Sequence, residues 1–251
     1  MTCKICGMGD EHGHPPWMYE EKKMTYIIAE AGINHNGDMS LALKLIDAAV
    51  EAKADAVKFQ LFHVERLKQY QLNEVQMRTL KSYCDGKIEF LCTPFDRAAV
   101  DTLDKLVSTF KIGSGQANQD FLSYVSAKGK PMIISTGMSE LSEIRHSVSD
   151  VEVPFTLLHC VSLYPTPPEK ADLQRMLTMK RGFSCPIGYS DHTEGIDIAL
   201  AAVALGAAVI EKHVTLDKSM QGPDHKASIT PEELKALVKG VKRIEESLKE
   251  T

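Results

Sequence analysis

Two patterns of hydrophobic and polar positions alternate along most of the chain. Short apolar runs rich in β-branched residues are separated by longer stretches in which apolar residues recur every three or four positions. The first pattern is typical of buried strands and the second of amphipathic helices. The strand pattern occurs in residues 26–33, 55–62, 88–95, 109–114, 131–137, 155–160, 185–191 and 207–214.

The stretches between these runs carry helix signals. Residues 39–54 place their apolar side chains on one face, and Gly206 stops the stretch 197–206. A last helix begins after Thr230, with Glu233 placed to complete a capping box. Strands that alternate with helices eight times predict an α/β fold, a (β/α)8 TIM barrel. An open doubly wound sheet is the alternative, but no glycine-rich nucleotide motif follows the first strand.

We expect residues 25–251 to form this one catalytic barrel and residues 1–24 to be a leader. Cys3 and Cys6 form a CxxC that is followed by His12 and His14. This segment fits either a small zinc knuckle or a loosely ordered tail. The other four cysteines lie singly in or beside apolar runs, so we expect reduced thiols.

Charge and hydropathy exclude several classes of partner. The net charge is −5, and the Lys and Arg residues are scattered, which argues against nucleic acid. No apolar run approaches the roughly 20 residues of a membrane span, and the first residues lack a signal-peptide core. The sequence therefore predicts a cytoplasmic protein with no membrane partner.

Every predicted strand ends in polar or ionisable residues, where a barrel builds its active site. One such residue could simply be a satisfied polar group in the barrel, but a converging set needs partners or a ligand. The set comprises Glu30, Lys58, Gln60, Thr93, Lys111, Ser114, Ser135, Thr136, His159, Ser162, Tyr164, Ser190, Asp191, His192, Glu211, Lys212 and His213.

Part of this set is suited to an anion. Lys58 and Lys111, with the hydroxyls of Ser114, Ser135 and Ser190, can surround a phosphate or a carboxylate. The glycines of "KIGSG" let backbone N–H groups approach such a ligand closely. The sequence therefore predicts a small anionic, phosphorylated substrate.

Two histidines indicate a metal site. His192 and His213 end the seventh and eighth strands, which are adjacent in a barrel, so the two rings can share a divalent ion. Asp191, Glu211 and Asp224 could orient the imidazoles or add a ligand.

Two other histidines leave alternatives open. His225, in "GPDHKAS", competes for the role of metal ligand. His35, in "INHNGD", could reach the site from the first loop or could only shape the turn.

Ordered motifs identify a family resemblance. "IIAEAGINHNGD", "AVKFQ", "TPFD", "FKIGSG", "STGM", "GYSDHT" and "EKHVTLDKSMQGPDHKAS" occur in the order seen in the sialic acid synthases, which make N-acetylneuraminate and related nonulosonates. The chain resembles that family over roughly residues 25–250. The resemblance implies condensation of phosphoenolpyruvate with an N-acetylated hexose, usually N-acetylmannosamine. It also implies a divalent metal, typically Mn²⁺, with Mg²⁺, Co²⁺ or Zn²⁺ as alternatives.

The resemblance also implies roles for individual residues. It assigns the metal to His192 and His213. It places phosphoenolpyruvate among Lys111, Ser114, Ser135 and Ser190. It places the reacting atoms and the sugar among Glu30, Lys58, Gln60, Thr93, Tyr164 and Asp224.

This chain departs from the family pattern in several places. Gln116 stands where the family usually has Glu, and Ser162, which we assign to the substrate site, stands where it often has Asn. The loop 63–74 is shorter than in many members. We expect no C-terminal antifreeze-like domain after the barrel, although members usually carry one that reaches a neighbouring subunit's site. A homodimer or higher homo-oligomer is expected, and a separate antifreeze-like domain is a candidate partner.

Two alternative functions remain compatible with these departures. One is another phosphoenolpyruvate-dependent 3-deoxy-2-keto sugar acid synthase with a different aldose acceptor. The other is a catalytically silent barrel that binds a sugar phosphate.

Overall fold

The computed structural model describes residues 24–249, and the CxxC segment with His12 and His14 lies outside the described residues. Eight strands form one sheet, and each coincides with a predicted apolar run. They are β1 (Tyr26–Gly32), β2 (Ala56–Leu61), β3 (Glu89–Pro94), β4 (Phe110–Ile112), β5 (Met132–Ser135), β6 (Phe155–Cys160), β7 (Ile187–Asp191) and β8 (Val209–His213).

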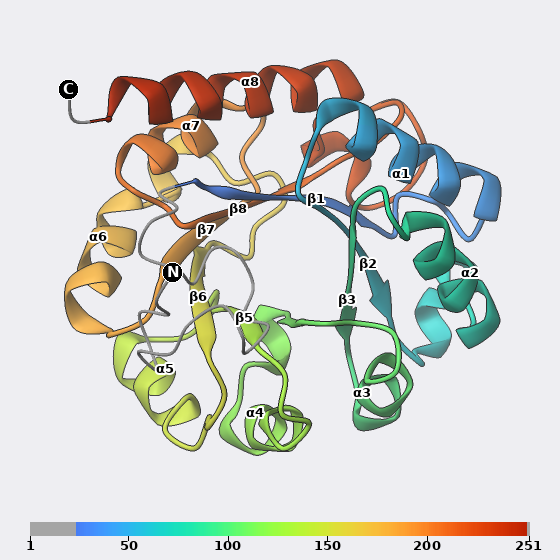
Figure 1. The fold of residues 1–251 in the computed structure, drawn as a ribbon, viewed down its shortest axis with the longest axis horizontal. Helices are drawn as coiled ribbons and strands as arrows, with labels where there is room; N and C mark the ends of the chain where they lie inside the picture. The colour runs from blue at the N-terminus through green and yellow to red at the C-terminus, as the bar shows by residue number, and fades with distance from the viewer. Residues whose placement is uncertain (1–23, 250–251) are drawn as a thin grey trace.

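The sheet closes on itself into a barrel. Its strand order is β3-β2-β1-β8-β7-β6-β5-β4, every paired neighbour is parallel, and the two end strands contact each other. Helices surround the strands on the outside (Figure 1). The predicted (β/α)8 barrel is confirmed, and the open doubly wound sheet is excluded.

Eight α-helices follow the strands in turn within the described residues. They are α1 (Met39–Ala52), α2 (Glu74–Cys84), α3 (Arg97–Leu103), α4 (Gln119–Ser126), α5 (Leu141–Ser147), α6 (Leu173–Gly182), α7 (Asp197–Ala204) and α8 (Pro231–Ser247). Between residues 24 and 249, four short 3₁₀ helices lie in the loops, namely η3 (Glu65–Tyr70), η4 (Ser114–Gln116), η5 (Pro168–Lys170) and η6 (His225–Ala227).

Two predicted helix boundaries have the expected local cause. Thr230 caps α8 and forms a reciprocal capping box with Glu233. Gly206 follows α7 with a φ of +82°, a left-handed conformation that glycine adopts without strain.

The core has two parts that reflect the alternation of side chains along each strand. A large cluster fills the layer between the sheet and the helices, and a small one fills the barrel interior. The interior cluster consists of Tyr26, Ile28, Ala56, Leu91, Ile133, Leu158 and Val209. Two residues further along six of these strands, on the same inward side, the sequence becomes polar or thiol-bearing, so one end of the barrel is polar inside. These positions are Glu30, Lys58, Thr93, Ser135, Cys160 and Glu211. We call this end, where the strands finish, the barrel mouth.

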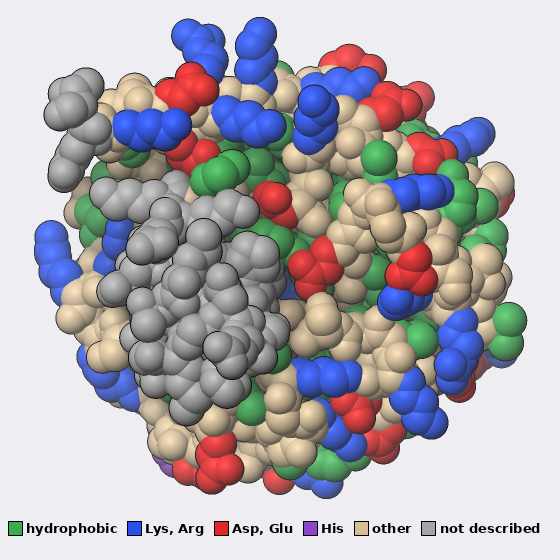
Figure 2. Space-filling view, viewed as in Figure 1, with side chains coloured by type: hydrophobic (Ala, Val, Ile, Leu, Met, Phe, Trp, Pro, Cys, Tyr) green, Lys and Arg blue, Asp and Glu red, His purple; other side chains and the backbone are tan. Residues whose placement is uncertain are grey.

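The surface carries charges of both signs. On the face in Figure 2, Lys and Arg side chains are interspersed with Asp and Glu over the described part of the chain, without a continuous basic patch. No helix among residues 24–249 is long and apolar enough to cross a membrane.

Candidate active site at the barrel mouth

Four buried ionisable residues meet inside the barrel mouth. Lys58 Nζ lies 2.8 Å from Glu30 Oε2 and 3.7 Å from Glu211 Oε2. Lys111 Nζ lies 3.4 Å from Glu211 Oε1. All four side chains are at most 7% exposed. Glu30, Lys58 and Glu211 each lie two residues beyond a member of the interior cluster, so strand alternation turns them inward, where they meet Lys111.

Hydroxyl groups surround the two lysines. Lys111 Nζ donates to Ser135 Oγ at 2.7 Å, and Lys58 Nζ donates to Thr93 Oγ1 at 2.8 Å. Ser190 Oγ donates to Glu211 Oε1 at 2.8 Å. Two ammonium groups with neighbouring hydroxyls form a cradle in which a small dianion could replace the internal partners.

A second group of small polar side chains adjoins the cradle at the loop after β5. Ser114 Oγ accepts from the Gly137 backbone N–H and contacts Cys160 Sγ, both at 3.0 Å. A Cβ atom on Gly137 would lie 2.5 Å from Ser162 Oγ and 2.8 Å from Ser114 Oγ. Ser114, Cys160 and Ser162 therefore gather around a position that only glycine fits.

The surroundings shift the pKa values of the two glutamates in opposite directions. Burial alone would raise the pKa of Glu211, but Lys111 and Lys58 outweigh it and lower this pKa to about 2. The pKa of Glu30 is raised, first by burial, which Lys58 only partly offsets, and further by the charge of Glu211. Glu211 is thus a fixed anion, and Glu30 is the carboxyl group of this cluster suited to carry a proton.

His192 and His213 lie side by side at the rim of the cluster. Their ring centroids are 5.7 Å apart, and the Tyr164 ring lies 4.1 Å from that of His192. His192 Nδ1 donates to the Val161 carbonyl at 2.7 Å, so Nε2 is the acceptor nitrogen, and it lies 3.5 Å from Ser190 Oγ. His213 Nδ1 lies 3.9 Å from Asp224 Oδ2 and has no hydrogen-bond partner among the described residues.

The two imidazoles fit a metal as a pair of neutral nitrogen donors. Burial lowers the pKa of both His192 and His213 to about 4, so each ring keeps a free lone pair at neutral pH. Within residues 24–249, no group of three His, Cys, Asp or Glu side chains is placed to hold an ion. The protein would therefore supply two nitrogens, and water or substrate would supply the other ligands.

We expect the metal-free protein to lose stability as the pH falls below 6.5. Burial lowers the pKa of His35, His192 and His213 from 6.5 to about 4, so the unfolded chain binds protons first. Stability is complete above the unfolded value and declines toward the folded one, by up to about 1.4 kcal/mol per histidine and pH unit. Urea unfolding at about pH 7, 6 and 5 measures this slope. A free energy of unfolding that stays constant over this range would contradict it.

Four predicted strand-end residues face away from the barrel interior. Asp191 Oδ2 pairs with Lys212 Nζ at 2.7 Å, and both side chains are 0% exposed. His159 Nε2 hydrogen-bonds the Ala171 carbonyl, and Thr136 Oγ1 donates to the Leu158 carbonyl. Asp191 lies on the opposite side of β7 from Ser190 and His192, so its carboxylate does not reach the imidazoles directly.

The alternatives for the two remaining histidines are now decided. His225 uses both ring nitrogens, with Nδ1 2.7 Å from Thr215 Oγ1 and Nε2 3.3 Å from Asn36 Oδ1. It is buried between two loops and has no nitrogen free for a metal. His35 Nδ1 accepts from the Gly37 backbone N–H at 3.0 Å, so this ring shapes the turn after β1.

The other predicted site residues lie around the ionic cluster. Gln60 Nε2 donates to Glu30 Oε1 at 2.9 Å. Gln116 turns its side chain toward the loop before it. Its Oε1 would lie 2.8 Å from a Cβ atom added to Gly113. Two residues deserve more weight than the sequence suggested. Glu211 lies at the centre of the ionic cluster and does more than orient the imidazoles. Cys160 adjoins the hydroxyl groups of Ser114 and Ser162.

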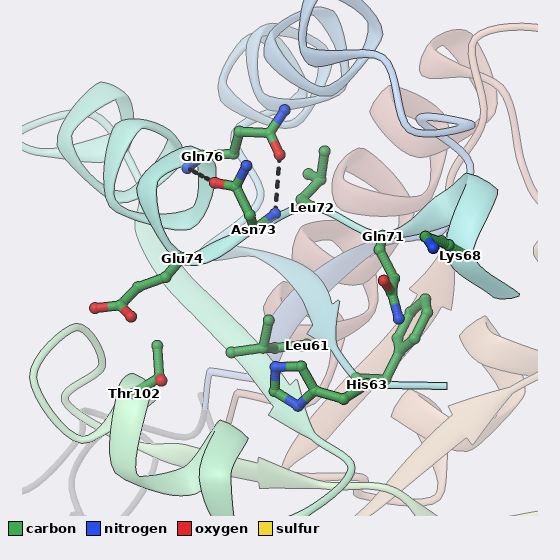
Figure 3. Close-up of a pocket in the computed structure, with 10 residues that line it drawn as sticks. Leu61, His63, Lys68, Gln71, Leu72, Asn73, Glu74, Gln76 and Thr102 are labelled. Atoms are coloured by element: carbon green, nitrogen blue, oxygen red, sulfur yellow. Dashed lines mark hydrogen bonds between the residues drawn. The ribbon is translucent and has the colours of Figure 1, made fainter. Parts of the chain in front are cut away.

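One cavity in the described part of the chain lies outside the ionic cluster. It has a volume of about 340 Å³ and lies between the end of β2, η3 and α2, with Leu61, Gln71 and Thr102 in its lining (Figure 3). Its polar lining is already engaged, since Asn73 and Gln76 form the capping box of α2. It shares no residue with the cluster, and we assign no chemistry to it.

A parallel eight-stranded barrel with paired lysines and carboxylates buried at its carboxyl end defines a barrel enzyme that handles a small anion. The chain belongs to the NeuB family, whose sequence model matches residues 45–251.

Individual relatives agree with this assignment. The chain is 44% identical to the N,N'-diacetyllegionaminic acid synthase of Campylobacter jejuni, over 90% of this chain and 78% of that protein. It is 37% identical to the N-acetylneuraminate-9-phosphate synthase of Mus musculus, over 90% of this chain and 72% of the relative. The crystal structure of the N-acetylneuraminic acid synthetase of Leptospira borgpetersenii, in complex with citrate, superposes with a TM-score of 0.87 at 40% identity, covering 90% and 86% of the two chains.

Proposed function

We propose that this protein condenses phosphoenolpyruvate with an N-acetylated hexose, N-acetylmannosamine or a related sugar, to give a nonulosonic acid and inorganic phosphate. The observation that carries the proposal is the buried lysine pair around Glu211, ringed by hydroxyl groups. Glu211 Oε2 and His213 Nδ1 also have no hydrogen-bond partner among the described residues, which suits a site that binds a polar ligand. The names of the relatives support the same class of product.

The reaction forms two bonds, a C–C bond to the sugar and a C–O bond from water, and breaks the bond between C2 and the phosphate oxygen. C3 of phosphoenolpyruvate forms a bond to the aldehyde carbon of the open-chain sugar, and the aldehyde oxygen takes a proton. Water adds at C2, and the resulting tetrahedral carbon expels inorganic phosphate to leave a 2-keto acid. One phosphoenolpyruvate, one aldose and one water give one nonulosonic acid and one phosphate.

Lys111 is the residue best suited to hold the phosphate of phosphoenolpyruvate. Its ammonium group lies beside Ser135 Oγ and is 1% exposed, so water does not screen it. Burial lowers the pKa of Lys111, partly offset by Glu211, and an incoming dianion would favour the charged form. Burial would lower the pKa of Lys58, but the charges of Glu211 and Glu30 outweigh it and raise this pKa. Lys58 therefore remains charged and would neutralise the substrate carboxylate.

Glu30 is our candidate for proton transfer. Burial raises its pKa, which favours the protonated form, and Gln60 and Lys58 fix its two oxygens. Glu30 would protonate the aldehyde oxygen as the new bond forms and then accept a proton from the attacking water. Gln116 cannot exchange protons in this way, so the acid–base work falls to Glu30.

The residues that would hold a metal are His192 and His213. A divalent ion there, with Mn²⁺ as our choice, would act as a Lewis acid toward the aldehyde oxygen. Tyr164 covers the His192 ring, and its phenol keeps its proton at neutral pH and can donate to the sugar.

We expect phosphate release from phosphoenolpyruvate to require both Mn²⁺ and an acceptor aldose. The measurement is a colorimetric phosphate assay with each component omitted in turn. N-acetylmannosamine is compared with arabinose 5-phosphate, because the latter would indicate a synthase of another 3-deoxy-2-keto sugar acid. Absence of turnover across a panel of N-acetylhexosamines, hexoses and pentose phosphates, despite binding of phosphoenolpyruvate, would favour a silent binding barrel.

We also propose that the protein acts in the cytoplasm as a homodimer or a larger homo-oligomer. The resembled family supports this, since its members bring an antifreeze-like domain to a neighbouring subunit. A separately expressed antifreeze-like domain should then lower the KM for the sugar and leave that for phosphoenolpyruvate unchanged. Light scattering of the purified chain measures the assembly.

A further inference from the structure

Two polar side-chain interactions connect β7 and β8 at consecutive positions, one on each side of the sheet. Ser190 is paired in register with Glu211, and Asp191 with Lys212. The first interaction, the Ser190–Glu211 hydrogen bond, lies inside the mouth. The second, which we call the positioning pair, is the Asp191–Lys212 ion pair at 2.7 Å in the layer between sheet and helices.

The positioning pair holds the backbone beside His192. Asp191 Oδ1 accepts from the Thr193 N–H at 2.9 Å and from Thr193 Oγ1 at 2.8 Å, and Lys212 Nζ donates to the Thr193 carbonyl. Thr193 in turn bridges Thr166, whose N–H donates to the His192 carbonyl. Asp191 and Thr193 flank His192 in the sequence, so its backbone is fixed on both sides.

The same pair acts on His213 through its neighbour. Lys212 precedes His213 on β8, and its side chain is 0% exposed, so it cannot reach the mouth or a substrate. A buried ion pair contributes little stability over apolar residues of similar volume. The pair lies between β7, which His192 directly follows, and β8, which ends at His213. This placement suggests that the pair helps to position the two histidines.

We infer that the Asp191–Lys212 positioning pair sets the relative placement of the His192 and His213 rings, which it touches only through the backbone. The inference rests on the proposed function only in treating these rings as metal ligands. Disturbing groups that orient metal ligands typically costs 10- to 100-fold in metal affinity. The pair is thus a positioning device and not part of the catalytic machinery.

The test separates positioning from stability. Removing one partner leaves a buried unpaired charge and costs about 3–5 kcal/mol, so a single variant could simply unfold. The double variant Asp191→Asn/Lys212→Met removes both charges, keeps the volumes and leaves an oxygen for the Thr193 N–H. The control is Asp104→Asn/Lys130→Met, an ion pair at 3.0 Å at the opposite end of the barrel.

We expect the double variant to remain folded by urea titration and to bind Mn²⁺ roughly 10- to 100-fold more weakly, measured without substrates by the electron paramagnetic resonance of free Mn²⁺. The control should bind within about twofold of the unmodified protein. Equal Mn²⁺ affinity in the double variant and the unmodified protein would overturn the inference.

A second readout does not depend on the metal. If the unmodified protein binds no divalent ion, the metal part of the proposed function fails, and crystal structures then decide the inference. A change in the ring separation from 5.7 Å in Asp191→Asn/Lys212→Met supports it. An unchanged separation with unchanged backbone at Thr193 overturns it.

Discussion

Replacing His192 or His213 by Ala should lower kcat/KM by about 1,000-fold or more, because loss of Lewis-acid assistance removes several kcal/mol of transition-state stabilisation. The fold should survive, since both rings sit at strand ends and not in the apolar core clusters. Bound Mn²⁺ is counted after equilibrium dialysis, and circular dichroism checks the fold.

His225→Ala is the matched control for both histidines. His225 is equally buried, but its nitrogens contact Thr215 and Asn36. This variant should lose some stability and keep its metal stoichiometry. Metal retained in a His192→Ala/His213→Ala double variant, or metal lost in His225→Ala alone, would contradict the assignment.

Lys111→Met should raise the KM for phosphoenolpyruvate by roughly 10- to 150-fold, since a charge-assisted hydrogen bond contributes about 1.5–3 kcal/mol. The KM for the sugar should change little, because we propose that Lys111 holds the phosphate of phosphoenolpyruvate. Steady-state phosphate release with each substrate varied in turn separates the two constants.

The Lys111 experiment needs a control for loss of stability. Removing Lys111 leaves Glu211 with only Lys58 at 3.7 Å, and an uncompensated buried charge destabilises by about 3–5 kcal/mol. The double variant Lys111→Met/Glu211→Gln removes both charges and should show the same rise in KM. Lys130→Met, at the other end of the barrel, should leave both constants unchanged. A rise in the KM for the sugar alone would contradict the assignment of Lys111 to phosphoenolpyruvate.

Sequence reasoning located the strands well because each is a short apolar run between turn residues. The chief difference is β4, predicted over residues 109–114 and observed as Phe110–Ile112. Ser114 instead begins the 3₁₀ turn η4, which places its hydroxyl near Gly137. Glycine-rich "GSG" was a signal for such a turn.

Which polar residues face the mouth was harder to predict. Asp191 and Lys212 have the same residue types as the site groups but lie on the outer side of β7 and β8. Side-chain direction depends on strand parity, which the type of residue does not reveal. Counting two residues from Leu158 or Val209 would have pointed to Cys160 and Glu211. Knowing that Leu158 and Val209 face inward required the structure.

The glycine at position 137 has a consequence for attempts to redesign the enzyme's sugar range. Any side chain there would collide with Ser114, Cys160 and Ser162 at 2.5–2.8 Å, so a saturation library at this codon should return almost only the parental residue. Tyr164, which we propose contacts the sugar, is 45% exposed and has room to vary. Variation should therefore be concentrated at Tyr164, while the neighbourhood of Gly137 is kept constant.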